Sequence, residues 1–76
     1  MNLLDLGIGN AAKIISVGGP RSFRRRLLEL GLTPGTTISV LRVAPLGDPL
    51  ELSARGSSLS IRRQEASEIL VKTGEA

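Results

Sequence analysis

Residues 36–62 read TTISVLRVAPLGDPLELSARGSSLSIR, and this stretch decides the fold because apolar and polar residues alternate along it in three short runs. The runs cover residues 36–43, 50–55 and 58–62, with segments rich in turn-forming residues between them. Alternation with a period of two is typical of strands that bury one face and leave the other in water. We therefore expect three consecutive strands here.

The first of these strands changes phase in its middle. Ile38 and Val40 lie on one face, whereas Leu41 and Val43 lie on the other. An extra residue in one strand of an antiparallel pair produces such a switch, so we expect a β-bulge or a bend at a barrel corner.

The second and third strands are typical of a hairpin. The residues between them, Gly56 and Ser57, suit a two-residue turn of type II′. The outward positions of both strands are polar, which is the pattern of a sheet with one wet face. We expect the inward side chains to be Leu50, Leu52, Ala54, Leu59 and Ile61.

Upstream of the strands lies the one clear α-helix, at about residues 20–30. Phe23, Leu27 and Leu30 recur at helical spacing and form its expected apolar face. Gly31 suits the left-handed position that ends many helices, and we expect the leucine after it to pack back onto Leu27.

Two further runs, 11–17 and 69–73, complete a set of five strands, and residues 63–68 suit a short helical turn. The opening residues 3–6 form another short β-like run before a Gly-rich turn. Five short strands with one helix in residues 1–76 predict a single, mainly β domain, built as a small, partly open barrel.

The composition excludes several classes of function. The 76 residues contain no cysteine and no histidine, so disulfides and the usual ligands of transition metals are missing. A general base would have to be a carboxylate or a lysine, and no catalytic constellation is visible. We expect no enzyme activity, no cofactor and no intrinsic metal site. We also expect a cytosolic protein, because no signal peptide and no run of about 20 apolar residues is present.

Two glycine-rich segments resemble ligand-binding motifs. GIGNAA (7–12) fits the dinucleotide fingerprint G-x-G-x-x-A, but a strand is expected after it instead of a helix, so we interpret it as a turn. GGPRS (18–22) leads into the helix beside Arg21, and suits either an anion site or a sharp entry into the helix.

The segments RRLLELGLTPGT (25–36) and APLGDPLEL (44–52) carry a resemblance to a known family. Together with LLDLGIGNAAKIISV (3–17) they resemble the cytoplasmic ferrous-iron transport protein A (FeoA) family over nearly the whole chain. One departure is Ile8, where the family often has proline.

The resemblance implies an SH3-like barrel and a non-enzymatic accessory or regulatory role in ferrous iron transport. The implied partner is the membrane Fe(II) transporter FeoB, which carries the GTPase and the pore. The family is often described as binding transition metal ions, but without ligands here the Fe(II) is expected to pass through the partner. The implied location is cytoplasmic, at the inner face of the membrane when docked.

The loop at residues 44–49 is the first candidate for partner binding, through Pro45, Leu46 and Asp48. Two prolines restrict the loop, so binding through it loses little conformational entropy. Leu46 either stands exposed as a recognition point or folds back to plug the barrel. An exposed apolar patch here would also suit self-association.

The arginine cluster Arg24, Arg25 and Arg26 is the second candidate, as electrostatic support for a partner contact. The three side chains point in different directions around a helix, so solvated flanks of the apolar stripe are the simplest interpretation. The alternative function is a small RNA- or ribosome-associated β-barrel that uses these arginines. Nucleic acid is the less favoured partner, because the single aromatic, Phe23, is expected in the core.

Overall fold

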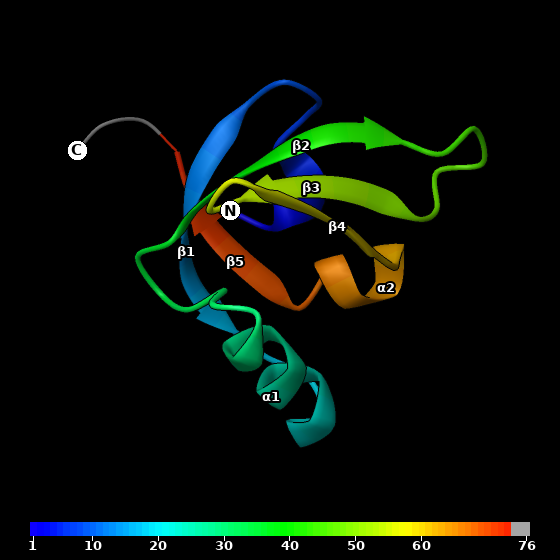
Figure 1. Ribbon diagram of the computed structural model, residues 1–76. Coiled ribbons are helices and arrows are strands. Elements are labelled where there is room, and N and C mark those ends of the chain that lie inside the picture. The colour runs from blue at the N-terminus through cyan, green and yellow to red at the C-terminus, as the bar shows by residue number, and fades with distance from the viewer. Residues whose placement is uncertain (74–76) are drawn as a thin grey trace.

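The computed structural model describes residues 1–73 and shows a curled sheet with one helix beneath it (Figure 1). The helices and strands, in chain order, are η1 (Leu3–Asp5), β1 (Ala11–Val17), α1 (Arg21–Glu29), β2 (Thr37–Val43), β3 (Leu50–Ala54), β4 (Ser57–Ile61), α2 (Arg63–Ala66) and β5 (Ile69–Lys72). The number of strands, the main helix and the short helical turn are as the sequence predicts.

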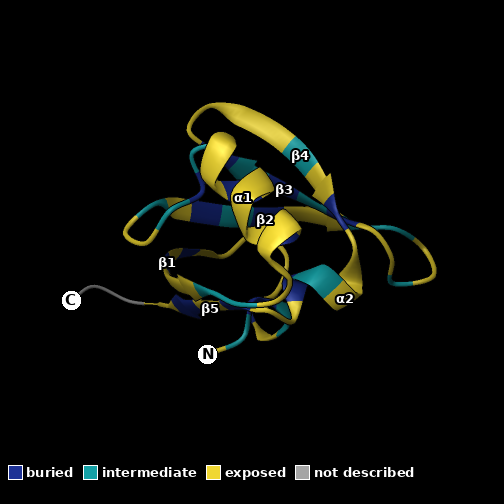
Figure 2. Ribbon diagram, turned by 90° about the horizontal axis from the view of Figure 1, so that it is seen from below, coloured by how far each residue is buried: buried dark blue, intermediate teal, exposed yellow. Residues whose placement is uncertain are grey.

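The five strands form a single antiparallel sheet in the order β4-β3-β2-β1-β5. Its mainly β, SH3-like architecture confirms the expected fold class. The two edge strands are β4 and β5, and Figure 2, seen from below, shows α1 lying between them. The helix thus covers the side on which the sheet does not close.

The core is built from apolar side chains of every strand and of α1, and all of them except Phe23 are aliphatic. Phe23 and Leu27 come from the helix, and Leu52, Ile69 and Val71 come from the strands around it. The expected inward positions of the hairpin are confirmed, with the third residue of β4 half-buried and the others buried.

The bulge predicted in the strand after the helix is present. The register between β2 and β3 shifts between Val40 and Arg42, which leaves Leu41 outside the pairing and half-exposed. A second irregularity occurs in β1, where the pairing to β5 shifts around Ile15. The apolar Ile15 side chain is consequently half-exposed instead of packed.

The hairpin turn differs from the prediction by one residue. Ala54 pairs with Ser57, so the two loop residues are Arg55 and Gly56, with φ values of 54° and 81°. Positive φ at both positions defines a type I′ turn instead of type II′, and its twist matches that of the flanking strands. The sequence pattern missed it because an arginine rarely adopts this conformation.

The end of α1 follows the prediction closely. Gly31 has a φ of 84°, and its N–H donates to the Leu28 carbonyl at 3.0 Å. The Leu32 N–H donates to the Leu27 carbonyl at 2.8 Å, which completes a Schellman motif and brings Leu32 into the core. Leu30, expected on the apolar face, is exposed, because the helix has ended before it.

The opening residues form the helix η1 instead of an extended run. The Asn2 side chain accepts a hydrogen bond from the Leu4 N–H at 2.8 Å and so caps the turn. Leu3 is fully buried and Leu6 nearly so, which places this segment against the core. Leu3 and Leu6 therefore pack in the core, as the apolar residues of a strand would, but they are spaced three residues apart, as on a helix.

Truncating Leu27 to alanine should destabilise the protein by about 2–5 kcal/mol, since the fully buried side chain would leave a cavity under α1. The matched control is Leu28→Ala in the next position of the same helix, where the side chain is 63% exposed. We expect the control to change the free energy of unfolding by less than about 0.5 kcal/mol. Urea unfolding of both variants measures this, and equal losses would contradict the packing described.

Candidate functional site

The loop at residues 44–49 is closed by its own backbone. The Gly47 N–H donates to the Ala44 carbonyl at 2.7 Å, and the Ala44 N–H donates to the Pro49 carbonyl at 3.0 Å. Leu46 lies at the tip with 96% of its surface exposed. The interpretation of Leu46 as a plug of the barrel is therefore wrong, and the loop presents it to the solvent.

Asp48 lies in the same loop but has a structural task. Its Oδ1 accepts a hydrogen bond from the Arg63 N–H at 2.9 Å, at the first residue of α2. The Glu65 Oε1 likewise accepts from the Arg62 N–H at 3.1 Å. Two carboxylates thus satisfy N–H groups that the start of a helix leaves without intrahelical partners. Asp48 anchors the loop to α2.

The strands that flank the loop are joined by an ion pair. The Arg42 Nε donates to the Glu51 Oε1, and these residues oppose each other across β2 and β3. The hydrogen bond from Arg42 and the attraction of the Glu51 charge raise the pKa of Arg42 above its ordinary value. Arg42 therefore stays charged, and the pair helps to fix the base of the loop.

The three arginines of the cluster have different environments. The Arg26 Nη2 lies 3.3 Å from the Glu65 Oε1, and its guanidinium carbon lies 5.8 Å from the centroid of the Phe23 ring. Both contacts hold Arg26 against α2 and the rim of the core. Arg24 and Arg25 are exposed and make no ion pair within residues 1–73.

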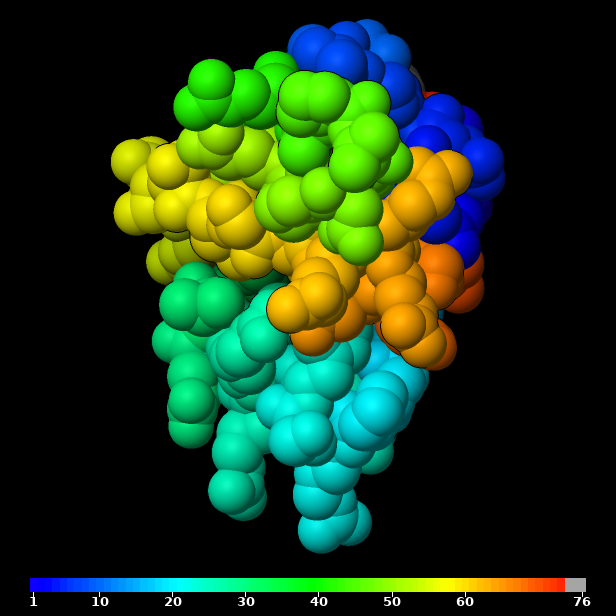
Figure 3. Space-filling view, turned by 90° about the vertical axis from the view of Figure 1, so that its right-hand side faces the viewer, coloured from blue at the N-terminus to red at the C-terminus, as the bar shows by residue number. Residues whose placement is uncertain are grey.

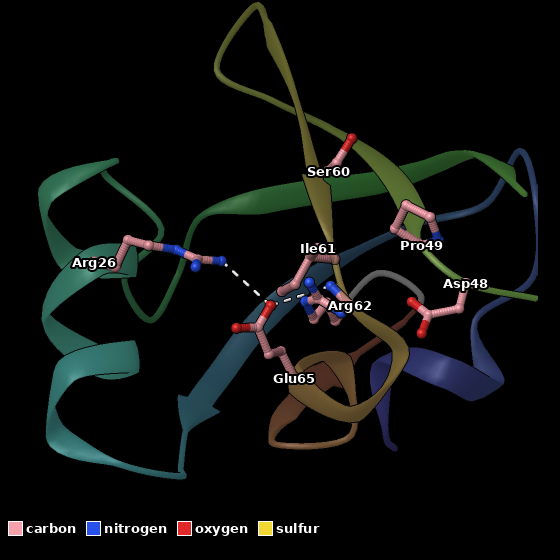
Figure 4. Close-up of a pocket in the computed structure, with 7 residues that line it drawn as sticks. All are labelled: Arg26, Asp48, Pro49, Ser60, Ile61, Arg62 and Glu65. Carbon is pink, nitrogen blue, oxygen red and sulfur yellow. Dashed lines mark hydrogen bonds and ion pairs between the residues drawn. The ribbon is translucent and has the colours of Figure 1, made fainter.

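Two of the predicted residues, Arg26 and Asp48, share a surface pocket of about 360 Å³ between α1, β4 and α2 (Figure 4). Its lining residues are Arg26, Asp48, Pro49, Ser60, Ile61, Arg62 and Glu65. The sequence analysis did not single out Glu65, because the usual capping pattern has Ser or Thr three residues before the glutamate, and this chain has Arg62 there. The other predicted residues do not line this pocket.

The loop and the two helices lie on one face of the molecule. Figure 3 shows the loop at 44–49 in green at the top, α2 in orange below it, and α1 in cyan and teal at the bottom. We call this surface the loop–helix face, defined by residues 44–49, 62–66 and 21–29. It gathers all six residues that the sequence analysis proposed for partner binding.

The glycines before α1 serve close packing. The Gly18 N–H donates to the Glu68 carbonyl at 2.8 Å, and a Cβ on Gly19 would lie 3.1 Å from the Glu68 Cγ. The Glu68 carboxylate is therefore close to the start of α1, where it disfavours a second anion. Of the two readings of this segment, the sharp entry into the helix fits the structure.

Two further kinds of feature, metal-binding clusters and membrane-spanning helices, are absent from the part of the chain that the structure describes. Within residues 1–73, no three side chains of the types His, Cys, Asp and Glu come together as a metal-binding group. None of the helices in that part of the chain has the length and apolar character needed to cross a bilayer. The Gly-rich segment 7–12 forms a turn followed by β1, so the dinucleotide interpretation is excluded by its context.

Comparison with known proteins places this arrangement in context. A family model described as the FeoA domain matches residues 1–73. The chain is 40% identical over 72 residues to the Fe(2+) transport protein A/Fe(2+) transporter FeoB fusion protein of Porphyromonas gingivalis. That match covers 95% of this chain and 8% of the fusion protein, so the chain spans a small part of that relative.

Solved structures share the fold. The solution structure of FeoA protein from Chlorobium tepidum superimposes with a TM-score of 0.92 at 45% identity, covering 96% of this chain and 70% of that one. FeoA from Stenotrophomonas maltophilia, crystallised with zinc, gives a TM-score of 0.82 at 28% identity and covers 95% and 89% of the two chains. That protein is described as a prokaryotic SH3 domain protein and a candidate activating factor of ferrous iron transport.

Replacing Asp48 by alanine should lower the free energy of unfolding by about 1 kcal/mol, because the Arg63 N–H loses its acceptor. Asp48→Asn keeps a side-chain oxygen at that position and should retain most of the stability. Chemical unfolding of both variants tests this. If Asp48→Ala were as stable as the parent chain, the anchoring role would be wrong.

Proposed function

The chain belongs to the FeoA domain family, and from this premise we propose that it is a non-enzymatic interaction domain that regulates or assembles a FeoB-type ferrous iron transporter. The family consists of small accessory domains and is not known as an enzyme family. In the Porphyromonas gingivalis relative a similar segment is joined covalently to FeoB, which links the family to that transporter. We propose that this chain acts as a single domain at the cytoplasmic side of the membrane.

The observation that carries the proposal is the exposure of Leu46. A leucine with 96% of its surface in water gains from burial against a partner. The backbone hydrogen bonds of the loop and its anchor to α2 hold Leu46 in place before binding. A preorganised apolar side chain gains the free energy of burial at an interface with little loss of ordering entropy.

Pro45 and Asp48 belong to the same contact in this proposal. Pro45 precedes Leu46 and limits the conformations of the tip. Asp48 acts through its bond to α2 and keeps the loop in register with the rest of the loop–helix face. Its loss should therefore weaken binding by loosening the loop.

The arginines support the contact at longer range. Arg24 and Arg25 are exposed, and cations on a face attract a negatively charged partner and accelerate the encounter. Arg26 contributes less to this attraction, because Glu65 compensates its charge.

An RNA-binding function is less well supported. Single strands bind through aromatic platforms and a positively charged groove. Phe23 is 7% exposed and lies under Arg26, so it offers no free platform. The pocket that contains Arg26 also contains Asp48 and Glu65, which makes its charge mixed.

The substitution Leu46→Asp should abolish retention of the transporter in a pull-down from detergent-solubilised membranes of the source cells. The aspartate places a charge where the contact buries an apolar side chain. Ile15→Asp is the control, since the Ile15 side chain is apolar and 49% exposed and lies on β1, away from the loop (Figure 1). We expect the control to retain the transporter.

Loss of the transporter in both variants, or in neither, would contradict the loop as contact site. The salt response separates the two functions, since a contact anchored on Leu46 weakens only modestly between 50 and 200 mM salt, whereas phosphate binding falls steeply. Recovery of RNA-containing particles that salt releases would favour the alternative function.

Zinc and Fe(II) should change the melting temperature by less than about 1 °C at 100 μM, because the chain offers no His or Cys ligand. A site with micromolar affinity would instead add about 2.7 kcal/mol under these conditions and raise the melting temperature by about 10–20 °C. Thermal unfolding with and without each metal, with Mg²⁺ as control, measures this. A specific rise with zinc would bring this chain into line with the zinc-bound relative and would contradict our expectation.

A further inference from the structure

The net charge of the protein is concentrated on α1. The chain has ten Lys and Arg and seven Asp and Glu, and α1 contains four of the former and one of the latter. Six residues of each sign remain for the rest of the chain, so α1 accounts for its whole net charge of +3. A molecule with this distribution orients its helix toward a negative surface.

The free charges of α1 lie on its outward side. Arg26 is paired with Glu65, which leaves Arg21, Arg24 and Arg25 exposed and without an ion pair in the described part of the chain. At about 100° per residue, these three span an arc of about 100° that excludes Phe23 and Leu27, the two α1 residues that pack in the core.

Leu28 lies inside this arc, between the arginines. Its side chain is 63% exposed and does not belong to the core, whereas its neighbour Leu27 is fully buried. An exposed leucine beside several cations suits contact with an anionic lipid surface, where the cations meet the headgroups and the leucine reaches the edge of the acyl chains.

We propose that the outward side of α1, formed by Arg21, Arg24, Arg25 and Leu28, binds the anionic headgroups of a lipid bilayer. The inference goes beyond the proposed function, because it concerns lipid and holds whether or not a transporter is present. It divides the loop–helix face between two partners: the outward side of α1 contacts lipid, and the loop at 44–49 contacts the transporter.

The shape of this side favours a bilayer over a folded protein. Figure 3 shows long side chains of α1 projecting outward from the bottom of the molecule as separate fingers. A planar, fluid surface accommodates such a convex side without a complementary groove. Mobile headgroups also adjust to arginines that no neighbour holds in place.

The expected binding is weak and depends on charge. Each basic side chain contributes about a fivefold gain at an anionic surface, so three arginines give about a hundredfold gain over a neutral bilayer. The attraction decays over a Debye length from the surface, and added salt shortens that length, so high salt removes most of this gain. Binding of this strength orients a docked domain without fixing it irreversibly to the membrane.

Vesicle co-sedimentation of the purified chain tests the proposal. The vesicles contain phosphatidylcholine with one third phosphatidylglycerol, or phosphatidylcholine alone, at 50 and 300 mM salt. We expect binding to the anionic vesicles at low salt and a large loss at high salt. The triple variant Arg21→Gln, Arg24→Gln, Arg25→Gln should lose about a hundredfold in affinity, and Leu28→Ala should lose a few-fold.

The matched control removes the same charge from outside α1, in the triple variant Arg55→Gln, Arg62→Gln, Arg63→Gln. These arginines are also exposed, and we expect the control to lose less than about fivefold. Thermal unfolding of both triple variants verifies that they remain folded.

Three results would overturn the proposal. They are absence of binding to anionic vesicles at 50 mM salt, equal losses in the two triple variants, and binding to neutral vesicles that does not depend on the α1 arginines. Preference of the same helix for an RNA oligonucleotide or for an acidic protein over the vesicles would also overturn it. None of these results bears on the loop, so failure here and failure of the proposed transporter contact are distinguishable.

Discussion

The packing of α1 into the open side of the sheet is the constraint on which the rest of the structure depends. The chain is short and its core is almost entirely aliphatic, so Phe23 and Leu27 supply a large share of what the strands cannot bury among themselves. The Schellman motif at Gly31 ends the helix at the point where Leu32 reaches the core. The apolar side of α1 is thereby fixed inward, and its arginines are fixed outward.

This orientation separates the surface into parts with different chemistry. Arg26 and Glu65 link α1 to α2, and Asp48 links α2 to the loop at 44–49. These contacts use charged side chains for local structure and leave the pocket between the helices with charges of both signs. The apolar tip at Leu46 and a set of cations on α1 are exposed and take no part in these contacts. We interpret the first as a protein contact and the second as a lipid contact.

Much of the fold can be predicted from short stretches of sequence, because strands, bulges and helix ends depend on interactions between residues that are close in the chain. The alternation in residues 36–62 specifies the strands, the phase change at Leu41 specifies the bulge, and Gly31 specifies the end of the helix. The turn at Arg55 was predicted incorrectly, because its left-handed conformation is imposed by the pairing of β3 with β4.

The candidate site was less predictable, because its contacts join distant parts of the chain. Arg26 and Glu65 are 39 residues apart, and Asp48 meets Arg63 across 15 residues. No periodicity reveals such pairs, so the structural task of Asp48 could not be separated from a binding task in advance. The exposure of Leu46 also could not be predicted, because the same loop sequence is compatible with a buried leucine that plugs the barrel and with an exposed one that contacts a partner.

The central claim is that the loop at 44–49 is the surface a transporter covers. Amide spectra of the ¹⁵N-labelled chain, recorded alone and with the detergent-solubilised transporter, test it most directly. The account predicts that signals of Ala44, Leu46 and Gly47 broaden or shift first, while those of Ile15 and its neighbours in β1 change little. Changes confined to β1 and β5, or an unchanged spectrum with the transporter in excess, would contradict it.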